Sequence, residues 1–134
     1  NHPVKELIWT VGLSANVAGN YTDNAAVASG ARPVTKAKLQ LNGHDRFAER
    51  NGDYFNLVQP YQHHSRTPSS TGIFVYSFAL KPEEHQPSGT CNFSRIDNAV
   101  LNYSSDSSTS IKVYAVNYNV LRVMSGMGGL AYSN

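Results

Sequence analysis

The side chains with the most evident chemical potential gather in residues 82–101, PEEHQPSGTCNFSRIDNAVL. Glu83-Glu84 stand beside His85 and offer acid–base groups, and Cys91 is the only cysteine in the chain. Acid–base or nucleophilic catalysis also needs a nucleophile within reach of its base. No nucleophile stands at a recognisable elbow such as Gly-x-Ser-x-Gly. We therefore interpret the two glutamates as solvated loop charges and Cys91 as a reduced, half-buried small side chain.

Two further histidine motifs, His44-Asp45 and His63-His64, are candidates for acid–base or metal chemistry. Neighbouring residues on a strand point to opposite faces, so His63 and His64 would not converge on one ion and are interpreted as polar loop residues. A zinc site needs converging ligands, and no second pair at metal-binding spacing supports them. We therefore predict no catalytic residue, no metal and no cofactor.

The remaining polar groups of residues 82–101 are interpreted as structural. Arg95 and Asp97 lie two apart on an expected strand, so they would project from one face and pair with each other or with a neighbouring subunit. Pro82 and Pro87 fix their own φ angles, and Ser88-Gly89 is a typical turn sequence. The stretch is therefore predicted to form turns that precede a strand.

Composition limits the classes of function. Charged residues make up 15% of the 134 residues, against about a quarter in typical proteins, and the net charge is +2. The eleven Lys and Arg are scattered, so direct nucleic-acid binding has little support, and no apolar run is long enough to cross a membrane. The length suits one domain. Because the chain starts at Asn1 rather than Met, and strand-like residues follow almost at once, we interpret it as a piece of a longer polypeptide.

Alternating apolar residues predict an all-β domain. In residues 5–13 one face carries Leu7, Trp9, Val11 and Leu13, as in a half-buried strand. Residues 14–32 are small and polar and are expected to form a long loop. Residues 34–41 alternate in the same way, and the Asn42-Gly43 pair that follows predicts a hairpin.

The second half of the chain adds three expected strands. Residues 71–82 are apolar on both faces, which predicts a strand covered on both sides and ended by Pro82. Residues 92–103 and 110–124 are expected to form one strand each. Helical structure is limited to a possible single turn in residues 44–55. Six or seven strands with uneven loops favour a β-sandwich of the jelly-roll type.

Long strings in this sequence resemble the major capsid protein of nucleocytoplasmic large DNA viruses. The resemblance runs in order from Asn1 to Asn134 and thins only at residues 14–32 and 104–110. The strings that carry it include NHPVKELIW, YFNLVQPYQHHSRTP, QPSGTCNFSRID and NYNVLRVMSGMGGLAYSN.

The resemblance implies a fold and a role. Residues 1–134 would be a single domain, the second, C-terminal jelly roll of a double jelly-roll protein, with a first strand lying before Asn1. Homotrimers of such proteins form pseudo-hexagonal capsomers that contact neighbouring capsomers and minor capsid proteins, and tile an icosahedral virion shell. The shell encloses double-stranded DNA and assembles inside the infected cell, in the cytoplasm or nucleus. The segment from Pro87-Ser88-Gly89 to Ser94-Arg95-Ile96-Asp97 would lie between strands of the jelly roll and carry no catalysis.

Two other functions are open to a jelly roll. A carbohydrate-binding module would use aromatic side chains as stacking platforms, and Trp9 with eight tyrosines is available. Trp9 alternates with Leu7 and Val11, however, which favours a place in the core. A cupin-like enzyme would need histidine and carboxylate ligands that converge inside the barrel, whereas the histidines here are expected in loops.

Overall fold

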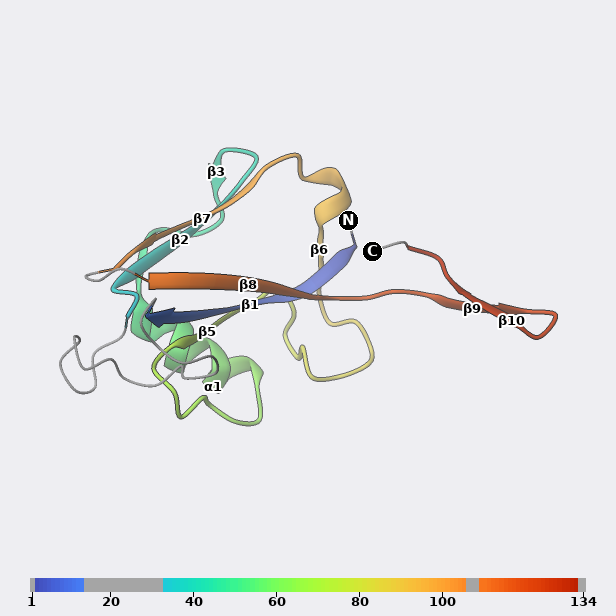
Figure 1. Cartoon of the computed structure of the whole chain (residues 1–134), viewed down its shortest axis with the longest axis horizontal. Coiled ribbons are helices and arrows are strands. Elements are labelled where there is room, and N and C mark those ends of the chain that lie inside the picture. The colour runs from blue at the N-terminus through green and yellow to red at the C-terminus, as the bar shows by residue number, and fades with distance from the viewer. Residues whose placement is uncertain (1, 14–32, 106–108, 133–134) are drawn as a thin grey trace.

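The computed structural model describes residues 2–13, 33–105 and 109–132 (Figure 1). Within these ranges the chain is dominated by antiparallel strands arranged in two facing sheets and one separate hairpin. The prediction of an all-β domain is therefore confirmed. The expected loop at residues 14–32 lies outside the described residues.

The first sheet is built around β1 (Pro3–Leu13). β8 (Thr109–Asn117) pairs along one edge of β1 from Val4 to Leu13. β5 (Ile73–Ser77) and β6 (Cys91–Asn92) pair end to end along the other edge. β1 is thus the central strand, which explains why its inward-facing Trp9 is almost completely buried.

The second sheet is built around β2 (Lys36–Leu41). β7 (Ala99–Ser104) pairs along one edge, and the short β3 (His44–Asp45) and β4 (Arg50–Asn51) share the other. The predicted Asn42-Gly43 turn joins β2 to β3, with φ angles of 52° and 80°. Both values lie in the left-handed region that a type I′ hairpin turn requires, so this prediction is confirmed.

The core between the sheets is aromatic. Trp9 of β1 stacks on Phe74 of β5 with ring centroids 5.9 Å apart, and it also meets Phe55 at 5.2 Å. Ala37 and Leu39 of β2 close the core from the second sheet. The placement of Trp9 in the core is confirmed, and with an exposed fraction of 1% it is no platform for a sugar ring.

The largest correction concerns helical structure. The possible turn was placed in residues 44–55, but the helical segment consists of η1 (Tyr54–Val58) and α1 (Gln59–His63). The buried face of this segment includes the polar residues Asn56 and Gln59. The sequence therefore lacks the regular spacing of apolar residues that would have predicted a helix. Asn56 donates to the carbonyl oxygens of Ser70 and Ile73, and Gln59 accepts from the backbone N–H of Ser77. These bonds satisfy the buried amides and hold the helix against β5.

Two of the expected strands begin or end at other residues than predicted. The covered strand ends at Ser77, five residues before Pro82, because the Ser77 hydroxyl bonds to the backbone of Ala79 and bends the chain. Residues 92–103 are interrupted by the 3₁₀ turn η2 (Phe93–Arg95), where Asn92 accepts from the N–H of Ser94. β7 begins only after that turn.

The last expected strand, residues 110–124, is two strands. β8 ends at Asn117, and β9 (Leu121–Met124) forms a hairpin with β10 (Met127–Leu130), which the sequence analysis missed. Asn119 breaks the strand because its side-chain oxygen accepts from the N–H groups of Val120 and Tyr132. The overlooked signal is Ser125-Gly126, whose φ angles of 51° and 77° form the hairpin turn.

Candidate assembly surfaces

The polar candidates from the sequence do not converge on one site. Among the residues that the structure describes, no group of three His, Cys, Asp or Glu side chains is placed to hold a metal ion. Cys91 is a free, partly buried thiol, as interpreted from the sequence, and burial raises its pKa. The described part of the chain also contains no helix long and apolar enough to span a membrane.

His64 forms a bridge between two glutamates that the sequence analysis did not foresee. Its Nε2 lies 2.6 Å from Oε2 of Glu6 in β1, and its Nδ1 lies 3.2 Å from Oε1 of Glu83. Both ring nitrogens of His64 therefore face carboxylate oxygens. The bridge ties the end of α1 to the first sheet and to the loop after β5.

Glu83 is an exposed loop charge, as interpreted, but hydrogen bonds hold it in place. The two histidines are partly buried, and His63 lies in α1 and not in a loop, so their interpretation as loop residues is wrong for His63. Glu83 accepts from the backbone N–H and the hydroxyl of Ser65 as well as from His64. The backbone hydrogen bond from Ser65, with the bonds from His64 and the Ser65 hydroxyl, lowers the pKa of the Glu83 carboxyl. His63, the last residue of α1, lies 3.0 Å from the carbonyl oxygen of Leu80. Sequence spacing alone gave no signal, because Glu6 and His64 are 58 residues apart.

The other acid–histidine motif is a local strand feature. His44 and Asp45 form β3, and Asp45 accepts from Nε2 of Gln40 at 2.7 Å and from Nζ of Lys38 at 3.4 Å. The Gln40 hydrogen bond is the main cause that lowers the pKa of the Asp45 carboxyl. All of these side chains are exposed or partly exposed, which makes the group a cross-strand polar cluster and not a reaction centre.

Residues 82–101 act as a folded connection. A Cβ at Gly89, where φ is 147°, would lie 2.6 Å from the carbonyl oxygen of Phe78, so glycine is required there. The Ser88 hydroxyl accepts from the N–H of Lys81 and closes the loop. The expectation that Arg95 and Asp97 share a strand face is wrong. Arg95 ends the 3₁₀ turn η2, and the Asp97 N–H donates to Oδ1 of Asn42.

One side of the sandwich is open. Val113 of β8 lies directly opposite Trp9 and on the same face, yet it is 50% exposed where Trp9 is 1% exposed. In the second sheet, Tyr103 of β7 lies opposite the buried Ala37 and is 37% exposed. Only residues 105–108 join β7 to β8, so the two edge strands lie on the same side. No described strand pairs with the outer edge of either one.

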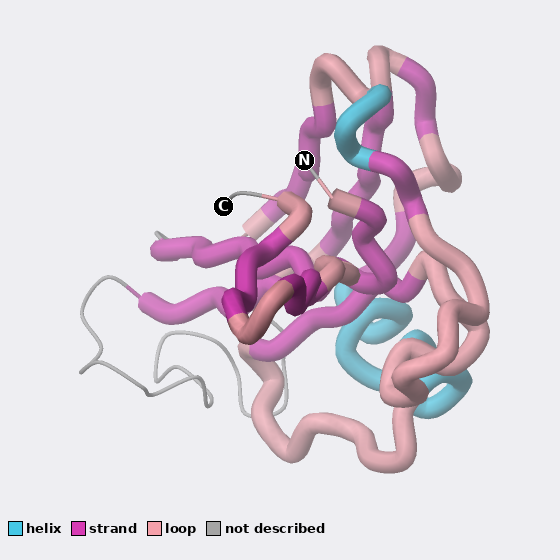
Figure 2. Tube along the Cα trace, turned by 90° about the vertical axis from the view of Figure 1, so that its right-hand side faces the viewer, coloured by secondary structure: helices cyan, strands magenta, loops and turns pink. Residues whose placement is uncertain are grey.

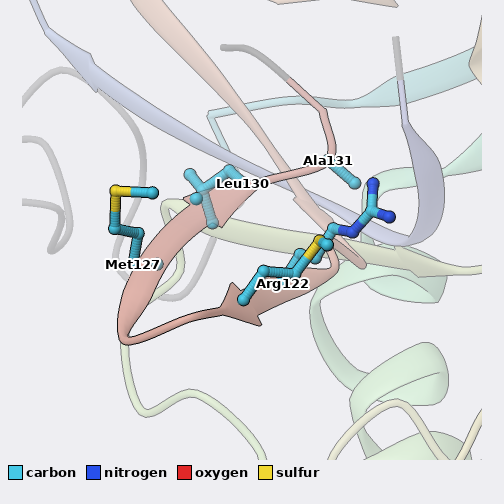
Figure 3. Close-up of a pocket in the computed structure, with 7 residues that line it drawn as sticks. Arg122, Met127, Leu130 and Ala131 are labelled. Atoms are coloured by element: carbon cyan, nitrogen blue, oxygen red, sulfur yellow. The ribbon is translucent and has the colours of Figure 1, made fainter.

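The second apolar surface is the hairpin of β9 and β10. It extends from the body of the molecule as a two-stranded ribbon (Figure 1). A hollow follows its glycine-containing strand, between Arg122 and Ala131, with Met127 and Leu130 beside it (Figure 3). Its large apolar side chains are all more than half exposed: Leu121, Val123, Met124, Met127 and Leu130.

A smaller apolar patch lies on the helical segment. Leu57 and Val58 are about 40% exposed, and Tyr61 is 81% exposed. Together with Gln62 and Thr67 they line a shallow hollow whose exposed surface is nearly all apolar. Exposed apolar surface of this kind marks contact areas on proteins more often than catalytic centres.

Comparison with known proteins gives these surfaces a family context. Residues 1–129 match the family model described as the large eukaryotic DNA virus major capsid protein. The chain is 55% identical to the major capsid protein of Pyramimonas orientalis virus, over all of this chain and 37% of the relative. It is 43% identical to the major capsid protein of Paramecium bursaria Chlorella virus 1, over all of this chain and 42% of the relative.

Solved structures agree with the sequence relatives. The chain matches the crystal structure of PBCV-1 VP54, fitted into a reconstruction of the virophage Sputnik, with a TM-score of 0.82 and 41% identity. The match covers all of this chain and 44% of VP54, a double jelly-roll protein, so the jelly-roll prediction is confirmed. The chain therefore spans about two fifths of the length of the relatives it matches. With its fold, its uncovered apolar surfaces and these matches taken together, the chain belongs to the major capsid protein family of large eukaryotic DNA viruses.

Proposed function

We propose that the chain is a structural building block of a virion shell and carries no catalysis. It would be the C-terminal jelly roll of a longer, double jelly-roll polypeptide whose homotrimers form capsomers of an icosahedral shell around double-stranded DNA. The observation that carries this proposal is the open side of the sandwich. Apolar side chains on the core-facing sides of β8 and β7 are half-exposed beside two unpaired strand edges.

The open side needs covering on physical grounds. Unpaired N–H and C=O groups beside exposed apolar residues invite edge-to-edge aggregation. The sequence analysis expects one missing strand, whereas the geometry presents two edges, one in each sheet. A pair of upstream strands, one added to β8 and one to β7, would complete both sheets and bury Val113 and Tyr103.

The patch around Tyr61 and the low content of charge support contact with further subunits. A neighbouring copy in a trimer, an adjoining capsomer or a minor capsid protein would cover such surfaces at little cost in desolvated charge. We propose assembly within the infected cell. The scattered basic residues give direct nucleic-acid binding no support.

The test compares the full-length polypeptide with residues 1–134 by native mass spectrometry and negative-stain imaging. We expect trimers of hexagonal outline from the full-length protein and aggregation of the isolated piece. Addition of the upstream strands should restore solubility to the piece. Sugar-responsive monomers would favour a carbohydrate-binding module, and stoichiometric bound metal would favour an enzyme. A monodisperse piece with every strand protected from hydrogen exchange would contradict the open-side argument.

A further inference from the structure

The β9–β10 hairpin lacks what usually stabilises two strands. In the part of the chain that the structure describes, these two strands pair only with each other, and an isolated two-stranded ribbon is at best marginally stable in water. One face carries Leu121, Val123 and Leu130, and the other carries Met124 and Met127. Apolar residues on both faces, all more than half exposed, indicate that something outside the described residues covers the ribbon.

Two glycines inside β10 point to the same conclusion. Gly126 is explained by its φ of 77° in the turn, but Gly128 and Gly129 have no such requirement. Among the described residues, a Cβ at Gly129 would meet no atom within 4 Å, and one at Gly128 would meet only the end of the Leu121 side chain at 3.9 Å. Glycine weakens a strand interior and often marks the place where another backbone approaches closely. The hollow of Figure 3 runs along these residues.

The base of the hairpin lies beside the start of the chain. The N–H of Tyr118 donates to the carbonyl oxygen of Pro3 at 2.9 Å, and the rings of His2 and Tyr132 are 5.2 Å apart. Figures 1 and 2 both show the first and last described residues of the chain close together, and Figure 1 shows the hairpin of β9 and β10 leading away from this place. Both ring nitrogens of the buried His2, and the hydroxyl of Tyr118, have no hydrogen-bond partner among the described residues.

We propose that the hairpin docks within its own polypeptide, against the part of the longer chain that precedes residue 1. This inference rests on the proposed function, in which the chain is the C-terminal part of a double jelly-roll protein. A segment that enters at His2 is tethered next to the hairpin, so its effective concentration there is far higher than that of a second copy. Arg122 is the only charged residue of the ribbon, so the occupant presents an apolar surface with little charge.

Site-specific photo-crosslinking of the full-length protein tests the partner. A benzophenone amino acid replaces Met127, and the same probe at Lys81, on an exposed loop, is the control. Mixed isotope-labelled and unlabelled protein separates crosslinks within one chain from crosslinks between chains. We expect Met127 to crosslink within one chain to residues upstream of position 1. Crosslinks between two chains, crosslinks confined to residues 2–132, or a yield no higher than at Lys81 would overturn the proposal.

A substitution tests the glycine argument independently. Gly129→Val adds a β-favouring side chain into space that no described residue fills, so an occupant of that space would make the substitution harmful. We expect trypsin to cleave the full-length protein after Arg122 at least tenfold faster than in wild type. His44→Val, on another exposed strand, should leave that rate unchanged. An unchanged rate in Gly129→Val would overturn the close-approach argument.

The outcomes separate this proposal from the proposed function. Trimers whose Met127 crosslinks join two chains would refute the intramolecular docking but preserve the capsid role. Monomers with crosslinks inside one chain would do the reverse.

Discussion

The bridge between Glu6 and His64 allows a quantitative prediction. The perturbation is His64→Ala, which removes the imidazole that lies 2.6 Å from the Glu6 carboxylate. The Glu6 side chain is 7% exposed and that of His64 is 17% exposed, so the substitution leaves a mostly buried carboxylate without its hydrogen-bond partner His64. Such a group destabilises the folded state because a buried charge has lost its compensation.

The expected cost follows from the burial. Removing one partner of a buried ion pair costs about 3–5 kcal/mol, and we take the lower end, about 3 kcal/mol, because water can reach the site where His64 is exposed. With about 1.4 kcal/mol for each factor of ten, amides of β1 should exchange about 100-fold faster in the variant. Glu83→Gln removes the exposed arm of the bridge and should have a much smaller effect.

Hydrogen exchange with mass spectrometry is the assay, since it reports the β1 peptide separately from the rest of the chain. The double variant Glu6→Leu/His64→Leu is the control, because replacing both partners with apolar groups leaves no unpaired charge and should recover much of the protection. If His64→Ala exchanges like wild type, or the double variant is the less protected of the two, the reasoning fails.

Three further predictions follow from single sites. Gly89→Ala should destabilise the β5–β6 region by about 1–3 kcal/mol, because φ is 147° and the new Cβ would lie 2.6 Å from a carbonyl oxygen. Gly43→Ala, in open space, is the control; equal exchange in the two variants would contradict the steric argument. Because hydrogen bonds lower the pKa of Glu83, its contribution to stability is present above the ordinary value of 4.5 and is lost as pH falls through the folded pKa. Wild type should therefore be more stable than Glu83→Gln near neutral pH, and the difference in their free energies of unfolding should shrink as pH falls through the folded pKa; a difference that stays constant with pH would contradict this. Burial raises the pKa of Cys91, so at pH 8 its alkylation, followed by peptide mapping, should be slower than that of an unfolded thiol.

The strands could be predicted because burial of one face of a strand requires an apolar residue at every second position. Trp9 and its neighbours in β1 alternate strictly, and Asn42-Gly43 has only one common structural use between strands. The helical segment could not be predicted in the same way, since the face that it buries includes two amides, Asn56 and Gln59. Their hydrogen bonds to β5 and the preceding loop become visible only when those segments meet in space.

The features of the candidate site also differ in whether they could be predicted from the sequence. The sequence shows locally that it has no nucleophile elbow and no metal-binding spacing. Of the Ser88-Gly89 pair interpreted as a turn, Ser88 lies at a bend, while the turn of this loop is at Pro82-Glu83. The bridge of Glu6, His64 and Glu83 could not be found, because its members come from three separate parts of the chain. Likewise, the open side of the sandwich depends on which strands lie at the sheet edges. The sequence of a single strand does not show where that strand lies in the sheet.

The amide side chains explain how a domain with few charges keeps irregular connections in place. Oδ1 of Asn42 accepts from the N–H groups of Asp97 and Asn98, so the hairpin turn also fixes the loop before β7. Asn119 does the same between the end of β8 and Tyr132. Neutral amides cost less to bury than ions do when another subunit covers them. A domain whose loops are held by amides therefore keeps a defined surface and can still be covered by neighbours, which suits the proposed place in a shell.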